Sequence, residues 1–143
     1  MFLAEVFPLF VGMIVLSLWA LGNISLGFVK RQKHDGLKKY FYEMNLMWNI
    51  VNLVIAIGAL VGLQDAYYNS PTPQGIIEYI DWTSNVLIIN IFLDIGYQLA
   101  GFWIFKKPLM KFKARMQGYG VSLILQGAFL FTLDCMMWVF LNL

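Results

Sequence analysis

The sequence predicts an all-α integral membrane protein, a single domain over residues 1–143 built as a bundle of four transmembrane helices. Of its 143 residues, 60% are hydrophobic and only 13% are charged, a composition outside the range of ordinary soluble domains. The apolar residues gather in four runs of about 20 residues, the length that a helix needs to cross the ~30 Å hydrocarbon core of a bilayer. Because these runs do not alternate in polarity, a barrel of two-sided strands is excluded.

The four predicted spans differ in the charge that they carry. They cover residues 6–29, 44–63, 83–105 and 117–140. The first two contain no charged residue, the third contains Asp94 close to its centre, and the fourth contains Asp134 nearer its C-terminal end. Short connections join consecutive spans, so we expect the helices to follow one another in up-down-up-down order.

The basic residues indicate how the helices are oriented. All ten Lys and Arg residues fall in the first and third connections, within residues 30–39 and 106–115. Short basic loops stay on the cytoplasmic side when a membrane protein inserts. We therefore expect two basic cytoplasmic loops, with the N- and C-termini outside the cytoplasm. For a bacterial source, the expected location is the inner (cytoplasmic) membrane.

The remaining connection, residues 64–82, is predicted to be an external loop. It has no basic residue and carries tyrosines and a tryptophan suited to a membrane interface. Within it, residues 74–80 follow Pro73 and either form a short interfacial helix or rest on the bilayer surface. Asp81 or Thr83 is then expected to cap the third helix.

Each predicted span carries polar side chains along one face. In the second span, Asn45, Asn49 and Asn52 recur at helical spacing. A rise of about 1.5 Å per residue brings the polar faces of all four helices to nearly the same depth. We therefore expect one shared polar centre that binds a ligand or a proton. Its predicted residues are Trp19, Asn23, Trp48, Asn49, Asn52, Asn90, Asp94, Tyr97 and Gln126.

Asp94 is the residue on which the predicted chemistry depends. No Lys, Arg or His lies in any span to pair with it, and an isolated carboxylate in a low-dielectric interior is costly. Asp94 is therefore expected to carry a proton or to bind a cation. Exchange of one for the other is the central step of a proton-coupled carrier. The alternative is that a protonated Asp94 and the asparagines only hold the helices together by hydrogen bonds.

Three further features bear on the expected site. Asp134 either lines an outward access route or simply reaches external water or an asparagine of the third span. Glu43, at the cytoplasmic mouth of the second span, is predicted to pair with a loop lysine. Trp19, Trp48 and Tyr97 would give a cavity aromatic walls, which suit an organic cation.

The sequence supports few other kinds of chemistry. The single histidine, His34, lies in the first basic loop, so neither a metal site nor a cofactor is predicted. No nucleophile lies beside a base and no glycine-rich phosphate loop is present, so an enzyme is not supported. A lipid-modifying activity at Asp94 stays open. The net charge of +2 does not indicate a nucleic-acid partner.

Three functions therefore remain open at this stage. The first is a transporter, either a proton-coupled carrier or a binding site for a small cation. The second is a structural or accessory subunit of a membrane assembly, and the third is an intramembrane binder of a lipid or pigment. The expected partners are membrane lipids, a small cation or proton, and either a second copy of the chain or a membrane complex. Gly58 and Gly62 are the predicted contact face of a homo-oligomer.

Overall fold

The computed structural model describes residues 2–69 and 72–143, and its elements within these ranges are helices, with no strand. They are α1 (Phe2–Glu5), α2 (Phe7–Lys30), α3 (Gly36–Asn69), α4 (Pro73–Lys106), the short 3-10 helix η1 (Met110–Phe112) and α5 (Lys113–Leu141). Four of them, α2, α3, α4 and α5, are long and apolar enough to cross a membrane. The prediction of an all-α protein with four membrane-compatible helices is confirmed.

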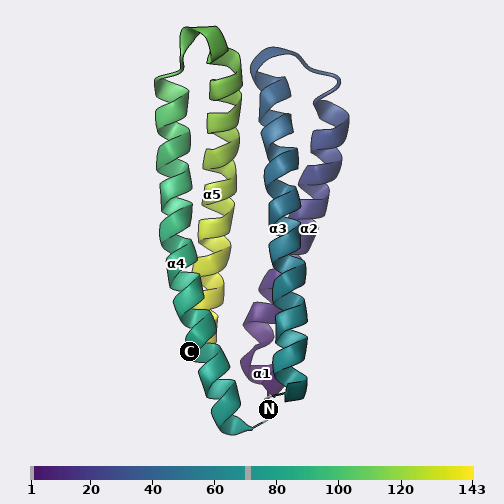
Figure 1. Cartoon of the computed structure of the whole chain (residues 1–143), viewed down its shortest axis with the longest axis vertical. Coiled ribbons are helices and arrows are strands. Elements are labelled where there is room, and N and C mark those ends of the chain that lie inside the picture. Colours follow the sequence, from purple (N-terminus) through teal and green to yellow (C-terminus); the bar gives the residue numbers. More distant parts are fainter. Residues whose placement is uncertain (1, 70–71) are drawn as a thin grey trace.

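The four long helices form two hairpins, α2 with α3 and α4 with α5 (Figure 1). The α2–α3 and α4–α5 connections lie at the same end of the bundle, and the α3–α4 connection lies at the other (Figure 1). Because all ten Lys and Arg residues belong to residues 30–39 and 106–115, they gather at the first of these ends. We call it the basic end.

The segment expected to be an external loop, residues 64–82, is mostly helical, which corrects the prediction. α3 continues to Asn69 and α4 already begins at Pro73, while residues 70 and 71 lie outside the described residues. Residues 64–69 contain no Gly or Pro, and Asn69 Nδ2 donates a hydrogen bond to Asp65 Oδ1 at 2.6 Å. Polar residues with such i, i+4 contacts continue a helix beyond its apolar part.

The start of α4 also differs from the expectation. Thr72 is the N-cap, and its Oγ1 accepts a hydrogen bond from the backbone N–H of Gly75 at 3.2 Å. Pro73 occupies the first turn, where its missing N–H costs nothing because that group has no partner within the helix. Asp81 and Thr83, the predicted caps, lie inside α4. The Thr72 cap and Pro73 in the first turn therefore set the start of α4.

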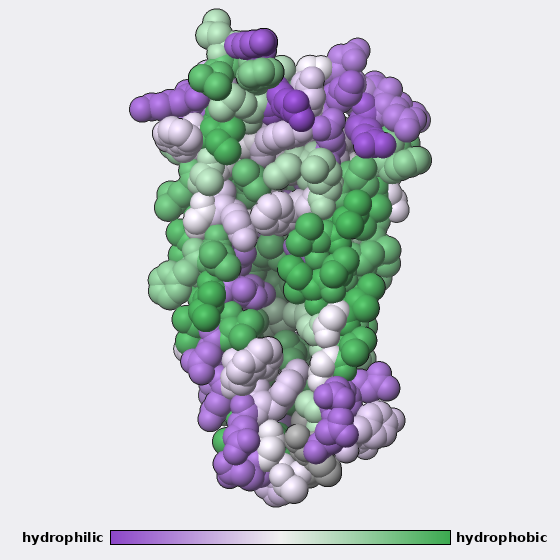
Figure 2. Space-filling model, viewed as in Figure 1, coloured by the Kyte–Doolittle hydropathy of each residue, from purple (hydrophilic) through white to green (hydrophobic). Residues whose placement is uncertain are grey.

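Side chains are distributed as expected of a protein in lipid. Large hydrophobic residues are exposed along all four long helices, and Figure 2 shows them as a broad apolar band between two polar ends. The interior instead contains polar residues that are almost fully buried: Asn23, Asn45, Asn49, Asn52, Asp94, Ser122, Gln126 and Asp134. An exposed apolar band of this extent would be unfavourable in water, whereas the hydrocarbon core of a bilayer stabilises it.

Glycines allow the helices to approach one another closely towards the basic end. A Cβ on Gly101 of α4 would lie 2.6 Å from the backbone oxygen of Gly120 in α5, and one on Gly118 of α5 would lie 2.5 Å from that of Leu37 in α3. Such contacts leave no room for a side chain. α3 and α4, by contrast, hardly touch each other. The bundle is therefore tight at the basic end and open between α3 and α4.

Candidate functional site

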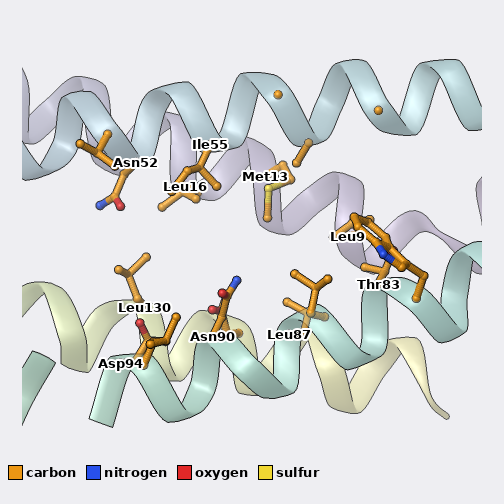
Figure 3. Close-up of a pocket in the computed structure, with 18 of the residues that line it drawn as sticks. Leu9, Met13, Leu16, Asn52, Ile55, Thr83, Leu87, Asn90, Asp94 and Leu130 are labelled. Atoms are coloured by element: carbon orange, nitrogen blue, oxygen red, sulfur yellow. The ribbon is translucent and has the colours of Figure 1, made fainter. Parts of the chain in front are cut away.

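A cavity of about 440 Å³ occupies the space between α3 and α4, with α2 and α5 behind it. Figure 3 shows that its lining side chains come from both hairpins and face one another across it. Most of them are apolar, and none is basic. The polar or aromatic lining residues are Trp48, Asn52, Tyr79, Trp82, Thr83, Asn90, Asp94, Tyr97 and Asp134.

Two carboxyl groups meet in this cavity. Asp94 of α4 is 3% exposed and Asp134 of α5 is 7% exposed, and their carboxyl groups lie close enough to interact. Neither oxygen atom of a carboxylate can donate a hydrogen bond. Because two charged carboxylates so close together would repel each other, the arrangement favours a proton on one of the two groups.

Two buried polar atoms beside the cavity have no hydrogen-bond partner among the described residues. Asp94 Oδ2 is buried and accepts no hydrogen bond from an N–H group or hydroxyl of the described residues, and the indole Nε1 of Trp48 is likewise buried without an acceptor. Asn52 on α3 and Asn90 on α4 point into the cavity from opposite walls (Figure 3). Buried polar groups rarely stay unsatisfied. An unpaired acceptor and an unpaired donor in one cavity are the arrangement expected of a site that holds a polar ligand or water.

Aromatic residues bound the cavity along its length. Trp48 of α3 and Tyr97 of α4 form an edge-to-face pair, with ring centroids 4.8 Å apart, on the side of Asp94 that faces the basic end. Tyr79 and Trp82 of α4 form a tilted pair, 6.4 Å apart, towards the other end. The faces of such rings attract cations. The acidic pair thus lies between two aromatic pairs.

A second group of buried polar residues lies at the junction of α2, α3 and α5, and Asn45 is its centre. Asn45 Nδ2 donates to Asn23 Oδ1 at 2.8 Å, while its Oδ1 accepts from Ser122 Oγ at 2.9 Å and from Gln126 Nε2 at 2.8 Å. Trp19 Nε1 donates to Gln126 Oε1 at 3.0 Å. We call these five residues the Asn45 cluster. Each hydrogen-bonding group of the Asn45 carboxamide has a partner from another helix.

The predicted site residues are therefore divided between two places. Trp48, Asn52, Asn90, Asp94 and Tyr97 line the cavity, and so does the predicted access residue Asp134. The other four do not line it: Trp19, Asn23 and Gln126 belong to the Asn45 cluster, and Asn49 donates to the backbone of Asn45. Asn52 links the two, since its Nδ2 donates to Asn49 Oδ1 at 3.4 Å. Whether any of them binds a ligand stays a prediction.

Glu43 has a different partner from the one expected. Its Oε1 accepts a hydrogen bond of 2.5 Å from the hydroxyl of Tyr119, and Arg115 Nε donates to the same hydroxyl at 3.1 Å. A tyrosine on a neighbouring helix therefore takes the place predicted for a loop lysine. A rigid ring reaches Glu43 with fewer lost rotamers than a lysine would. The contact joins α3 to α5 close to the basic end.

Two features of the chain went unrecognised in the sequence. Asn45 was predicted to lie on a polar face, but its role and that of Ser122 within the Asn45 cluster depend on contacts between helices. The approach of Asp134 to Asp94 was also missed. The indication available in the sequence was the spacing of Asp134 and Gly127; in the structure, a Cβ on Gly127 would lie 2.9 Å from the backbone oxygen of Asp94. Gly127 and Asp134 are seven residues apart on α5, about two turns, and so share a face.

The described residues contain no group of three or more His, Cys, Asp and Glu side chains that could hold a metal ion. The acidic centre of the cavity is therefore a pair of carboxyl groups without a third acidic, thiol or imidazole ligand. A pair of this kind, in a mainly apolar space, is suited to a proton or to an organic cation that brings its own apolar surface.

A protein-family model matches the chain. The model of a family of unknown function (DUF6992) covers residues 15–135, a range that includes both Asp94 and Asp134. No curated protein and no solved structure matches the chain.

Proposed function

We propose that this chain, which belongs to the family of unknown function DUF6992, binds an organic cation in the cavity and releases a proton in exchange. The observation that carries the proposal is the proximity of the buried carboxyl groups of Asp94 and Asp134 in a cavity whose described lining residues include no basic one. The proposed role is that of a carrier or a binding protein in a membrane.

The exchange follows from the charge of the acidic pair. With one shared proton, the pair carries a single negative charge. When a monovalent cation binds and the proton leaves, the two carboxylates and the cation together again carry a single negative charge, so the cavity need not hold an additional charge. Proton loss without a cation would instead place two negative charges in a low-dielectric space. Cation binding and proton release are therefore coupled.

The size and lining of the cavity favour an organic cation over a bare inorganic one. Its volume of about 440 Å³ lies in the range of roughly 300–1,000 Å³ that is typical of small-molecule sites. Trp48 and Tyr97 add ring surfaces beside the acidic pair, and a cation over such a ring gains about 0.5–2 kcal/mol. The apolar walls formed by Leu16, Leu87 and Leu130 suit the carbon skeleton of the ligand.

The proposal includes an orientation in the bilayer. The basic end faces the cytoplasm, and both termini and the α3–α4 connection face away from it, because basic connections are retained on the cytoplasmic side. If the source is bacterial, the membrane is the inner one. The glycine contacts and the pair of Trp48 and Tyr97 separate the cavity from the basic end. A carrier would open this side in a second conformation.

The test is cation binding to the purified chain in nanodiscs, followed by the fluorescence of its tryptophans, with 2-phenylethylamine as the probe. We expect saturable binding, with proton release measured in weakly buffered solution with a pH indicator. Asp94→Asn should weaken the affinity by about tenfold or more, since a charged hydrogen bond contributes roughly 1.5–3 kcal/mol. The matched control is Asp81→Asn, which changes an exposed acid of α4 outside the cavity.

Two results would contradict the proposal. Binding that releases no proton would show that the cation is not exchanged for a proton. Equal affinities of the Asp94→Asn and Asp81→Asn variants would show that the acidic pair does not bind the cation. The second result would favour an accessory subunit, in which Asp94 serves only the packing of the bundle.

A further inference from the structure

We infer that the ligand is an amphiphilic amine that reaches the cavity sideways from the bilayer, through an opening between α3 and α4 bordered by Gly58 and Gly62. The inference rests on the proposed function and specifies its ligand class and its route.

Several residues belong both to the cavity and to the outer surface of the bundle. Val51 and Ile55 of α3 are 51% and 52% exposed, and Trp82 and Leu93 of α4 are 63% and 48% exposed, yet all four line the cavity. Figure 2 shows a furrow at this position, between α4 and α3. The cavity is therefore open along the side of the bundle, within the apolar band that would face lipid.

Gly58 and Gly62 keep this opening free of side chains. They are four residues apart on α3, so they lie one above the other on the same face. Both line the cavity, and a Cβ at either position would meet nothing within 4 Å. Gly101, Gly118 and the other tightly packed glycines are explained by close helix contacts. At Gly58 and Gly62 the absent side chain leaves space that opens towards the surroundings.

The polarity of the opening selects the kind of molecule that passes through it. Val51, Ile55, Gly58 and Leu93 form an apolar rim, and the acidic pair lies deeper, against α5. A hydrated inorganic ion would have to leave its water in hydrocarbon, which is very costly. An amphiphilic amine can partition into the bilayer with its apolar body in the acyl chains. It can then move its amine from the rim to the carboxyl pair.

The buried, unpartnered oxygen of Asp94 favours an amine that carries hydrogen. Oδ2 accepts no hydrogen bond from an N–H group or hydroxyl of the described residues, and Asp94 is 3% exposed. A primary or secondary ammonium group can donate a short, charge-assisted hydrogen bond to this oxygen, whereas a quaternary ammonium group has no N–H to donate. The expected ligand is therefore a protonated amine with an alkyl or aromatic body.

The test compares leucine substitutions that are chemically identical but lie in different places. Gly58→Leu and Gly62→Leu place a side chain in the opening. Gly22→Leu and Gly96→Leu are the matched controls, because a Cβ at these positions also meets nothing within 4 Å and neither residue lines the cavity. The probe is hexylammonium in nanodiscs, with stopped-flow tryptophan fluorescence. Since all variants share the same lipid, partitioning into the bilayer cancels in the comparison.

We expect Gly58→Leu and Gly62→Leu to lower the association rate constant of hexylammonium by about tenfold or more, and the two controls to stay within about twofold of the original chain. Hexyltrimethylammonium should bind more weakly than hexylammonium to the original chain. Equal association rates in all four glycine variants, together with weakened binding in Asp94→Asn, would overturn the lateral route and leave the proposed function intact. Asp94→Asn binding as tightly as the original chain would instead contradict the proposed function itself.

A chemical plug makes the test independent of how the leucine variants fold. In a chain with Cys135→Ser, Gly58→Cys introduces a single thiol at the opening, and Gly96→Cys does so at the control position. Each protein is assayed before and after reaction with N-phenylmaleimide. Loss of hexylammonium binding on modification at position 58 but not at position 96 supports the lateral route, and equal binding after both modifications overturns it.

Discussion

The carboxyl groups of Asp94 on α4 and Asp134 on α5 lie close enough to interact across the interface between the two helices. Both residues are almost fully buried. Because the contact needs a proton or a cation between the two groups, neither residue is expected to titrate alone. Under the proposed function the two residues act as one unit, and their behaviour can be tested as a unit.

The first prediction concerns the pH dependence of binding. If each bound cation displaces the shared proton, its affinity should rise by about tenfold per pH unit as long as the pair still holds that proton. The dependence should flatten in Asp134→Asn, because the new amide can donate a hydrogen bond to Asp94 and no proton is needed. Binding titrations over a range of pH check this result. A slope that is unchanged in Asp134→Asn would show that the released proton comes from another group.

The same variants can be combined in a double-mutant cycle. Two groups that share one proton should not contribute independently, so the effects of Asp94→Asn and Asp134→Asn on the binding free energy should deviate from additivity by roughly 0.5–3 kcal/mol. The cycle requires the affinities of the original chain, both single variants and the double variant at one pH. Strict additivity would mean that the two residues act separately.

The next prediction separates the Asn45 cluster from the cavity. Asn45→Leu removes the partner of Asn23, Ser122 and Gln126 in three hydrogen bonds. At about 0.6 kcal/mol for each hydrogen bond between membrane helices, we expect a loss of roughly 2 kcal/mol in the free energy of unfolding. Cation affinity should change little, because Asn45 does not line the cavity.

Unfolding in mixed micelles with increasing SDS measures this loss, and Asn85→Leu, at an exposed position of α4, is the control. If Asn45→Leu abolished cation binding without destabilising the fold, the Asn45 cluster would belong to the functional site after all.

Features that depend on one helix at a time could be predicted from the sequence. The apolar runs predict four long helices, and Asp94 is unusual because it is the one charged residue of its predicted span. Both properties can be seen along a single segment of the sequence. The ends of α3 and α4 were harder to predict. Polar residues such as Asp65 mark the end of an apolar span, but they do not end a helix. α3 therefore continues past Asp65 to Asn69.

Features that depend on how helices face one another could not be predicted in this way. Trp19, Gln126 and Asp94 were placed at similar depths, and depth alone does not say which way each side chain points. The structure turns Trp19 and Gln126 towards Asn45 and separates them from the cavity. The rotation of each helix is set by its closest contacts, which for this bundle are the glycine contacts between α2, α3, α4 and α5.

These glycine contacts lead to a prediction about stability. In Gly101→Ala, the new methyl group would lie 2.6 Å from the backbone oxygen of Gly120, and a backbone atom cannot turn aside as a side chain can. Overpacking of this kind typically costs about 1–3 kcal/mol. Gly96→Ala on the same helix meets nothing within 4 Å and should leave stability almost unchanged. Thermal unfolding of both variants in the same detergent checks the difference, and equal melting temperatures would contradict the proposed close contact.

The last prediction tests the orientation of the bundle in the membrane. Because the chain has one cysteine, Cys135, a Cys135→Ser background allows single thiols to be introduced at Lys33 near one end and at Gln74 near the other. Both positions are exposed. With the basic end on the cytoplasmic side, a membrane-impermeant maleimide added to intact cells should label Gln74→Cys and leave Lys33→Cys unlabelled until the cells are opened. The reverse labelling pattern would show that the basic end faces away from the cytoplasm, which would contradict the proposed orientation.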